Sequence, residues 1–324
     1  MRVVNCVGFG PPDKLAPEER PDLAVLPEHV LIDVHACGVS FVDTLIIQGR
    51  YQIRPEPPFV PGSETAGVVS AVGKGVDDYA VGDRVIGMSL LNGFADQALL
   101  RPAQIRSLPA GLSFEQAAGF VQSYCTAYFS LHRRADLREG ETVLVLGAAG
   151  GVGLASIDVA KAMGARVIAA ASSPEKLDAC RRQGADELID YTKEDLKLRA
   201  KALSGGGVDV VVDPVGDAFA EPALRAIAPG GRYLVIGFAG GEIPTVRWNL
   251  ILLKQCQVIG VDWGGWSAKH HDENDRLFEE VGEWVSEGRL SPLAPATFPL
   301  EEAPRALREL MGRRIVGKAV LVTR

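Results

Sequence analysis

The chain has 324 residues, of which 47% are hydrophobic and 23% are charged, and it carries a formal net charge of −7 at pH 7. This length suits two globular domains, and an acidic balance without a long basic run argues against a nucleic-acid surface. There is neither a signal-peptide layout nor an apolar run long enough to span a membrane, so we expect no membrane association and a cytoplasmic location. Five scattered cysteines without a Cys-x-x-Cys pair predict reduced, buried thiols.

The first part of the chain, up to about residue 119, consists of short apolar segments separated by Gly and Pro. Strands are expected at 30–35, 62–73, 81–87 and 94–100. Short strands in close succession, without long helices between them, are typical of a compact, barrel-like module. Ser113-x-x-Gln116 fits a capping box, which predicts that a helix starts there and runs through Ala118.

From about residue 120 the pattern changes to apolar strands that alternate with helices. Strands are expected at 143–146, 165–171, 187–191, 208–213, 231–237 and 257–262, and helices at 153–164, 173–182 and 219–227. This alternation is typical of the α/β class with a doubly wound parallel sheet. Residues 263–324 add helices at 275–287 and 301–311 and a strand at 318–322, which we expect to return to the first module. The predicted domains are therefore 1–119 with 263–324, and 120–262.

The stretch 143–153 reads as a buried strand, a tight glycine turn and a helix start. Ala148-x-Gly150-x-x-Gly153 matches the dinucleotide-binding fingerprint, with Ala in its first place. Gly150 lets the backbone approach a pyrophosphate, Gly153 allows close packing of helix on strand, and the N–H groups at the helix start face the phosphates. A plain structural turn is the alternative, but the flanking strand and helix favour a dinucleotide. The predicted phosphate contacts are Ala149, Gly150, Gly151 and Val152.

The end of the second strand predicts which dinucleotide binds. In NAD-binding folds an acidic residue there holds the ribose 2′-hydroxyl, and this chain has Ala171 in that place. Ser172 and Ser173 follow, with Lys176 one helical turn later. These groups suit the additional 2′-phosphate of NADPH, which carries close to two negative charges. The two serines have an alternative role as caps of the helix that starts at Pro174, and both roles are compatible.

Seven segments, in order, carry a resemblance to a known family: CGVSFVDT at 37–44, PGSETAG at 61–67, VGDRV at 81–85, TAY at 126–128, LGAAGGVG at 146–153, DPVG at 213–216 and GK at 317–318. With them the chain resembles the zinc-free quinone oxidoreductases related to ζ-crystallin, within the medium-chain dehydrogenase/reductase superfamily. The resemblance covers nearly the whole chain. It implies a GroES-like catalytic domain joined to a Rossmann domain.

The same resemblance implies that no catalytic zinc is bound. Where zinc-dependent members carry their ligands, this chain has Ser40, Ser63 and Gln122, and a three-ligand zinc site needs Cys, His or acidic side chains. The four-cysteine structural-zinc lobe is also missing. The histidines show no ligand spacing, and we expect the pair His270-His271 to lie in a solvated loop.

The resemblance further implies which residues serve the reaction. It places Ser40, Phe41 and Asp43 along a nicotinamide cleft and Tyr51 on its substrate side, so Ser40, Asp43 and Tyr51 are the candidate catalytic residues. Asp43 has an equally good alternative role as a helix cap. Leu45 stands where some of these reductases have a Tyr near the substrate, so no proton donor is assigned.

The remaining cofactor contacts follow from the same comparison. Thr126 matches a position beside the nicotinamide ring, and Phe238 follows a strand whose end meets the nicotinamide half. Lys176, Tyr191 and Arg313 match residues that hold the 2′-phosphate in bacterial quinone reductases. The alternatives are that Tyr191 simply ends a strand and that Arg313 is a solvated helix end.

Without zinc, an alcohol lacks the Lewis acid that stabilises its alkoxide. The chemistry that remains is hydride transfer from NADPH to a small electrophile, either a quinone or an α,β-unsaturated carbonyl compound. Two alternatives stay open: an enoyl-thioester reductase, and an NADPH-binding structural or sensor protein with little turnover. Trp263 and Trp266 either wall the substrate cleft or pack at a dimer seam, because dimers in this superfamily often pair edge strands, and we expect a homodimer.

Overall fold

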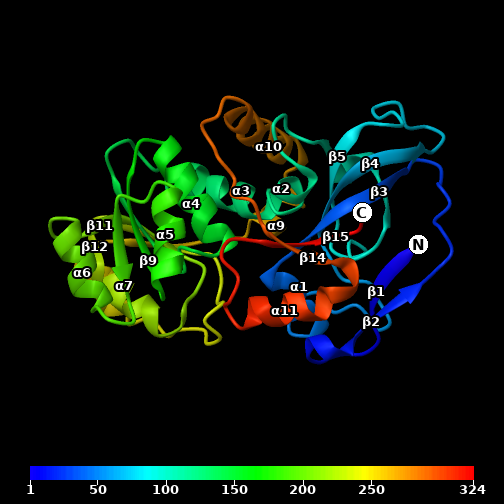
Figure 1. The fold of residues 1–324 in the computed structure, drawn as a ribbon. Coiled ribbons are helices and arrows are strands. Elements are labelled where there is room, and N and C mark those ends of the chain that lie inside the picture. The colour runs from blue at the N-terminus through cyan, green and yellow to red at the C-terminus, as the bar shows by residue number, and fades with distance from the viewer. The chain divides into compact units, whose positions relative to one another are not determined.

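The computed structural model describes residues 1–324 and divides them into two compact units, Met1–Val121 with Ala294–Arg324, and Gln122–Leu293 (Figure 1). Residues 263–293, which we expected beside the first module, cluster with the second unit. The helix α10 (His271–Ser286) packs there, because the hydroxyl of Tyr128 donates to Glu280 at 2.8 Å and its ring meets Trp284 edge-on.

The first unit is built on a seven-stranded sheet, in which antiparallel pairing dominates and only β14 and β15 run parallel. Along the sheet the strands are β14 (Ala296–Pro299), β15 (Ala319–Val322), β3 (Val30–Val39), β4 (Glu64–Val72), β5 (Arg84–Met88) and β7 (Ile105–Ser107), and β6 (Gln97–Leu100) pairs with β3. A separate antiparallel pair is formed by β1 (Arg2–Cys6) and β2 (Leu15–Glu19). The C-terminal strand β15 therefore lies inside the sheet, between β14 and β3.

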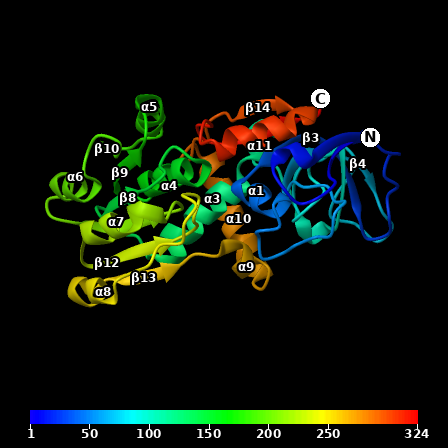
Figure 2. The same ribbon diagram turned by 90° about the horizontal axis from the view of Figure 1, so that it is seen from below.

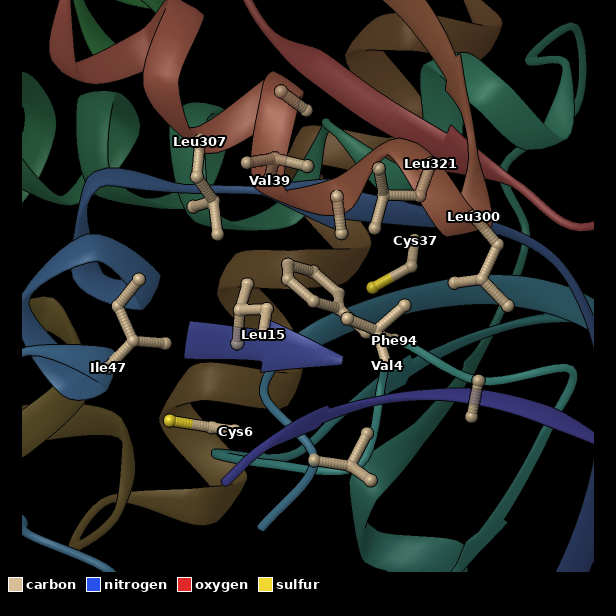
Figure 3. Close-up of a cluster of buried hydrophobic side chains, with 14 of the residues drawn as sticks. Val4, Cys6, Leu15, Cys37, Val39, Ile47, Phe94, Leu300, Leu307 and Leu321 are labelled. Carbon is tan, nitrogen blue, oxygen red and sulfur yellow. The ribbon is translucent and has the colours of Figure 1, made fainter. Parts of the chain in front are cut away.

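Three short α-helices accompany this sheet: α1 (Phe41–Ile47), α2 (Phe114–Ala118) and α11 (Ala303–Met311). The predicted capping box of α2 is confirmed, since the N–H of Gln116 donates to Ser113 Oγ at 3.2 Å and the N–H of Ser113 donates to Gln116 Oε1 at 3.2 Å. The core beneath α1 and α11 combines side chains from distant segments, among them Val4, Cys37, Phe94, Leu307 and Leu321 (Figure 3).

The second unit holds the predicted parallel sheet, in the order β10-β9-β8-β11-β12-β13. Its strands are β8 (Thr142–Val145), β9 (Arg166–Ala171), β10 (Glu187–Asp190), β11 (Val208–Asp213), β12 (Ile227–Val235) and β13 (Gln257–Gly260). The chain runs outward from β8 to β10 and then resumes at β11 on the other side of β8. The carboxyl ends of β8 and β11 therefore form a topological switch point, where ligands bind in open α/β sheets.

The helices of this unit are α3 (Val121–Tyr128), a π-helix (Phe129–Arg134), α4 (Gly151–Ala162), α5 (Pro174–Arg182), α6 (Leu196–Leu203), α7 (Ala220–Ala226), α8 (Trp248–Lys254) and α9 (Trp263–Ser267), together with α10. Figure 2 shows α8 and β13 next to one another at the edge of the unit. No helix of the structure is both long and apolar enough to cross a membrane. All five cysteines are buried and none forms a disulfide, as predicted.

The aromatic segment near residue 263 is held by packing inside the second unit. Trp263 is 9% exposed, and its ring N–H donates to Asn274 at 3.0 Å. Trp266 stacks against His270 and contacts Phe129, with ring centroids 5.2 and 4.7 Å apart. These contacts hold both tryptophans within the second unit, and their place at the substrate cleft or at a dimer seam stays a prediction. His270 and His271 are both exposed, as expected; His270 precedes α10 as its N-cap, whereas His271 is the first residue of the helix and so does not lie in a loop.

Candidate cofactor and active site

The glycine turn joins β8 to α4 at the switch point. Gly147 has a φ of 53°, a left-handed conformation that residues with a side chain rarely adopt. A Cβ on Gly153 would lie 2.5 Å from the carbonyl oxygen of Gly147, so helix and turn approach as closely as the fingerprint predicts. The first N–H groups of α4, which begins at Gly151, have no partner within the helix, so this end suits an anionic ligand.

The loop after β11 is held by Asp213, the last residue of that strand. Its Oδ1 accepts the N–H groups of Val215 and Gly216 at 2.8 Å each, and the hydroxyl of Tyr233 in β12 donates to its Oδ2. Phe238, in the loop after β12, packs so closely that a Cβ on Gly216 would lie 2.8 Å from its ring. Phe238 and the glycine turn thus both follow carboxyl ends of strands in one parallel sheet.

The residues predicted for the 2′-phosphate gather at the ends of β9 and β10. Ala171 is 2% exposed, and its carbonyl accepts the N–H of Tyr191 at 3.3 Å. Lys176 Nζ donates to Ser172 Oγ at 3.2 Å, which directs the ammonium group toward the end of β9. Ser173 Oγ accepts the N–H of Lys176 at 3.3 Å and caps α5, so its alternative role is confirmed. The structure therefore brings a cation and hydroxyls together where an NAD-binding fold has its acid.

Two other candidates of the second unit are held by local contacts. The ring of Tyr191 packs against Phe219 with centroids 4.4 Å apart, beside a surface groove of about 300 Å³ that both rings line. Thr126 is half-buried in α3, and its carbonyl accepts the hydroxyl of Ser130 at 2.6 Å. Packing against Phe219 holds the Tyr191 ring, and the helix α3 sets the backbone position of Thr126. The contact of either residue with a cofactor stays a prediction.

In the first unit Ser40 and Asp43 form a buried pair at the start of α1. Both the N–H and the hydroxyl of Ser40 donate to Asp43 Oδ2, at 2.7 and 2.9 Å. Asp43 is fully buried and Ser40 is 7% exposed, so the structure confirms the capping role of Asp43. Burial raises the pKa of the Asp43 carboxyl, while the bonds from Ser40 and the charge of Lys318 act in the opposite direction. Asp43 thus holds Ser40 in place, and a role of either residue toward a ligand stays a prediction.

A buried ion pair joins this arrangement. Lys318 Nζ lies 3.5 Å from Glu64 Oε2, and the carboxylate side chain is only 1% exposed. Burial, followed by the carboxylates of Asp43 and Glu64, raises the pKa of the Cys37 thiol well above its usual range, which leaves that thiol protonated and inert. Sequence reasoning assigned no role to Lys318 or Glu64. The sequence offered one signal for this pair: each of the two charged residues stands in a predicted strand that is otherwise mostly apolar.

Three further candidates also belong to the first unit. Phe41 is the first residue of α1 and is 36% exposed. Tyr51 is half-buried and packs against the core cluster of Figure 3. Arg313 is exposed and follows α11 with a φ of 56°, in keeping with a solvated helix end. The predicted contacts of these side chains with the cofactor or the acceptor stay predictions.

The comparisons with known proteins agree with this architecture. Residues 26–133 match the alcohol dehydrogenase GroES-like domain, and residues 151–281 match the family described as zinc-binding dehydrogenase. Quinone oxidoreductase-like protein 2 of Bos taurus is 41% identical over 307 residues, which cover 94% of this chain and 88% of that protein. Quinone oxidoreductase of Homo sapiens is 33% identical over 330 residues, covering 99% of this chain and 98% of that protein.

The chain belongs to the quinone oxidoreductase family of the medium-chain dehydrogenases/reductases. Among solved structures, Escherichia coli quinone oxidoreductase complexed with NADPH superposes with a TM-score of 0.92 at 29% identity, and each chain is covered completely. The predicted combination of a GroES-like and a Rossmann domain is confirmed. The protein is accordingly an oxidoreductase of a family that uses NAD(P).

One matched family is described as zinc-binding, but this chain does not have the zinc ligands expected at the corresponding positions. The positions expected for zinc ligands carry Ser40, Ser63 and Gln122. No group of three or more His, Cys, Asp or Glu side chains in the structure has an arrangement that could hold a metal ion. Because zinc in proteins is held by such side chains, the residues present do not fit a catalytic zinc.

Proposed function

We propose that this protein is an NADPH-dependent reductase of quinones or α,β-unsaturated carbonyl compounds that works without zinc. The observation that carries the cofactor choice is the end of β9, where Lys176 reaches Ser172 and the buried Ala171 replaces the acid of NAD-binding folds. A carboxylate there would repel a 2′-phosphate, whereas an ammonium and hydroxyls form charge-assisted bonds with it.

The cofactor, when bound, supplies the hydride. The residues of the glycine turn and the start of α4 hold its pyrophosphate, and Ser172, Ser173 and Lys176 hold its 2′-phosphate. Tyr191 and, from the first unit, Arg313 complete the phosphate contacts. Thr126 and Phe238 flank the nicotinamide half. The hydrogen bonds that fix Lys176 and the loop after β11 support these assignments.

At the acceptor end, Ser40 is the catalytic residue and Asp43 is its positioning residue. Negative charge develops on the acceptor's oxygen as hydride adds to the conjugated system, and a hydrogen-bond donor stabilises that charge. In the structure the one hydroxyl hydrogen of Ser40 is donated to Asp43, so in this proposal the O–H turns from Asp43 to the acceptor's oxygen when the acceptor binds. The bonds from Ser40 to Asp43 Oδ2 hold the Ser40 side chain in one orientation. Phe41 and Tyr51 provide apolar and aromatic surface for a planar acceptor.

The decisive experiment is NADPH oxidation with 1,4-benzoquinone, 9,10-phenanthrenequinone, an enal, an enone and an enoyl-CoA as acceptors. We expect the quinones to turn over fastest, in keeping with the names of the relatives. Faster turnover of the enoyl-CoA would replace this proposal with an enoyl-thioester reductase. Tight NADPH binding without turnover of any acceptor would favour the structural or sensor alternative.

The same assay tests independence from zinc. We expect purified protein to contain no stoichiometric zinc, and EDTA to leave the rate unchanged. Loss of activity on chelation, regained by added zinc, would contradict a metal-free mechanism. We propose a small electrophile as the other reactant and a second copy of the chain as the only protein partner. The cytoplasmic location stays a prediction.

A further inference from the structure

The chain passes between the two units at two places, between Val121 and Gln122 and between Leu293 and Ala294. Both connections are held, on the side of the second unit, by one side chain. The hydroxyl of Tyr124, just after the first connection, donates to Asp158 Oδ2 at 2.8 Å. The N–H of Ser291, just before the second, donates to the same oxygen at 2.7 Å.

The second connection is held on both sides of its backbone. In addition to the bond from Ser291 N–H to Asp158, the carbonyl of Ser291 accepts a hydrogen bond from Gln183 Nε2 at 3.1 Å. Tyr124, Asp158 and Gln183 are 5%, 7% and 6% exposed. The Tyr124–Asp158 bond is therefore shielded from water, whereas the two bonds of the exposed Ser291 are partly shielded. Removing one partner leaves the buried carboxylate or amide with fewer compensating bonds.

Asp158 is an unexpected residue for its position. Its neighbours on the buried part of α4, such as Ile157, Val159 and Ala160, are apolar and almost completely buried. An apolar side chain at 158 would avoid the cost of burying a carboxylate. Burial raises the pKa of Asp158, while the bonds from Ser291, Tyr124 and Gln183 act in the opposite direction. The carboxylate needs these donors, and they in turn tie the two connections to α4.

The same helix begins at the glycine turn. Asp158 lies about two helical turns beyond Gly151, where the phosphate-binding end starts. Tyr124 shares α3 with Thr126, the residue proposed to stand beside the nicotinamide. A single rigid helix therefore links the proposed pyrophosphate site at one end to both chain connections farther along.

We propose that Asp158 is a positioning residue that fixes both connections between the units to the cofactor-binding helix, so that NADPH binding at α4 restrains the two connections together. This inference rests on the proposed function, because it assigns the pyrophosphate to the start of α4. The acceptor residues belong to one unit and the dinucleotide fingerprint to the other, and hydride transfer requires the reacting atoms at near-attack distance. Looser connections would therefore lower kcat and leave cofactor affinity nearly unchanged.

The test uses the full-length protein and amide hydrogen exchange at residues 122–126 and 289–293, with and without NADPH. In the wild type we expect NADPH to slow exchange in both stretches. In Asp158→Ala we expect both stretches to exchange about tenfold faster or more, and the protection by NADPH to disappear. The Kd for NADPH, from nicotinamide fluorescence, should change less than about threefold, while kcat falls about tenfold or more, since small misplacements of reacting groups have large effects on rate.

Milder variants separate the effects on the two connections. Tyr124→Phe should loosen 122–126 alone, and Gln183→Met should loosen 289–293 alone, so the test survives if Asp158→Ala does not fold. Asp195→Asn is the matched control, because Asp195 Oδ1 likewise accepts a backbone N–H, that of Leu198 at 2.8 Å, but does so as the cap of α6 and without a bond to α4 or to either connection. It should leave exchange in both stretches unchanged.

Two results would overturn the inference. One is unchanged exchange at both connections in Asp158→Ala, Tyr124→Phe and Gln183→Met. The other is a loss of NADPH affinity in Asp158→Ala that is as large as its loss of kcat. Failure of the proposed function is distinguishable from either. If the wild type does not bind NADPH, the cofactor assignment fails, whereas the anchoring by Asp158 is still measured by comparing the exchange rates of the cofactor-free proteins.

Discussion

The choice of cofactor depends on a few side chains at the end of β9. Ala171 is almost fully buried there, and Lys176 is directed to Ser172 by a hydrogen bond. Lys176 is half-buried and can be exchanged to test recognition of the 2′-phosphate, whereas Ala171 is a buried core residue, so thermal unfolding must show that a variant at 171 still folds. A carboxylate introduced at 171 would favour the ribose hydroxyl of NADH and repel the phosphate of NADPH.

We expect Ala171→Asp to shift the ratio of kcat/KM for NADPH over NADH by about tenfold or more toward NADH, because the new carboxylate both repels the 2′-phosphate of NADPH and accepts a bond from the ribose 2′-hydroxyl of NADH. Lys176→Met is the companion variant, and it should weaken NADPH while leaving NADH nearly unchanged. Steady-state rates with both cofactors measure this. An unchanged ratio in both variants would remove the basis for the phosphate assignment.

Asp43 makes the stability of the first unit depend on pH. Burial raises the pKa of its carboxyl in the folded protein, so the folded state binds a proton more tightly than the unfolded chain does. Its contribution to stability is therefore largest at low pH and declines as pH rises from the ordinary Asp pKa of about 3.9 through the raised value.

Asp43→Asn abolishes this titration and keeps a side chain that can cap α1. We expect the stability of the variant relative to wild type to increase as pH rises through that window. Urea unfolding at a series of pH values measures the difference. A difference that does not change with pH would mean that Asp43 has its ordinary pKa in the folded protein.

At the scale of elements, the glycine turn and α4 are the best-determined part of the site. A Cβ on Gly153 would lie 2.5 Å from one carbonyl oxygen and 2.6 Å from another, and both are backbone atoms that have little room to move. The turn and the helix must then separate. The start of α4 would no longer be placed to bind a pyrophosphate.

We expect Gly153→Ala to lower the free energy of unfolding by about 1–3 kcal/mol, the usual cost of overpacking, and to weaken NADPH binding about tenfold or more. Gly264→Ala in α9 is the control, because a Cβ there meets only Asp262, at 3.9 Å. Thermal unfolding and NADPH titration report the two effects. Normal affinity in Gly153→Ala would show that the turn tolerates the shift.

These elements also show what sequence reasoning can reach. The strand, turn and helix start at 143–153 could be predicted because the apolar run and the glycines of the fingerprint are local features of the sequence. The helix α1 was missed because it is only seven residues long and rich in β-branched residues. The bonds of Asp158 to Tyr124 and Ser291 were out of reach, since they join residues 34 and 133 positions apart. Such pairings depend on tertiary packing, which no local pattern encodes.

At the scale of the whole molecule, one surface of the second unit remains unusually apolar. On α8, Trp248, Leu252 and Leu253 are 80%, 75% and 74% exposed. The neighbouring strand β13 pairs only with β12, so its other edge is open (Figure 2). A second copy related by a two-fold axis would pair this edge with itself and cover the same apolar side chains on both copies. We therefore propose a homodimer that forms through α8 and β13.

The variant Trp248→Asp/Leu252→Asp should be monomeric in sedimentation equilibrium at concentrations at which the wild type is a dimer, because charges would enter an apolar interface. Val81→Asp is the control, since Val81 is 67% exposed but belongs to the first unit. A wild-type monomer, or a variant that still dimerises, would exclude this surface as the interface.

The position of β15 also has a consequence for synthesis. This strand lies between β14 and β3, yet it comes from the last residues of the chain. The second unit is contiguous, and all of it precedes residue 294. As the ribosome delivers the chain from its N-terminus, the second unit is complete while the sheet of the first unit still lacks both β14 and β15. Until those strands are made, the part of β3 that pairs with β15 is an open sheet edge, which is the kind of edge that can pair with another chain.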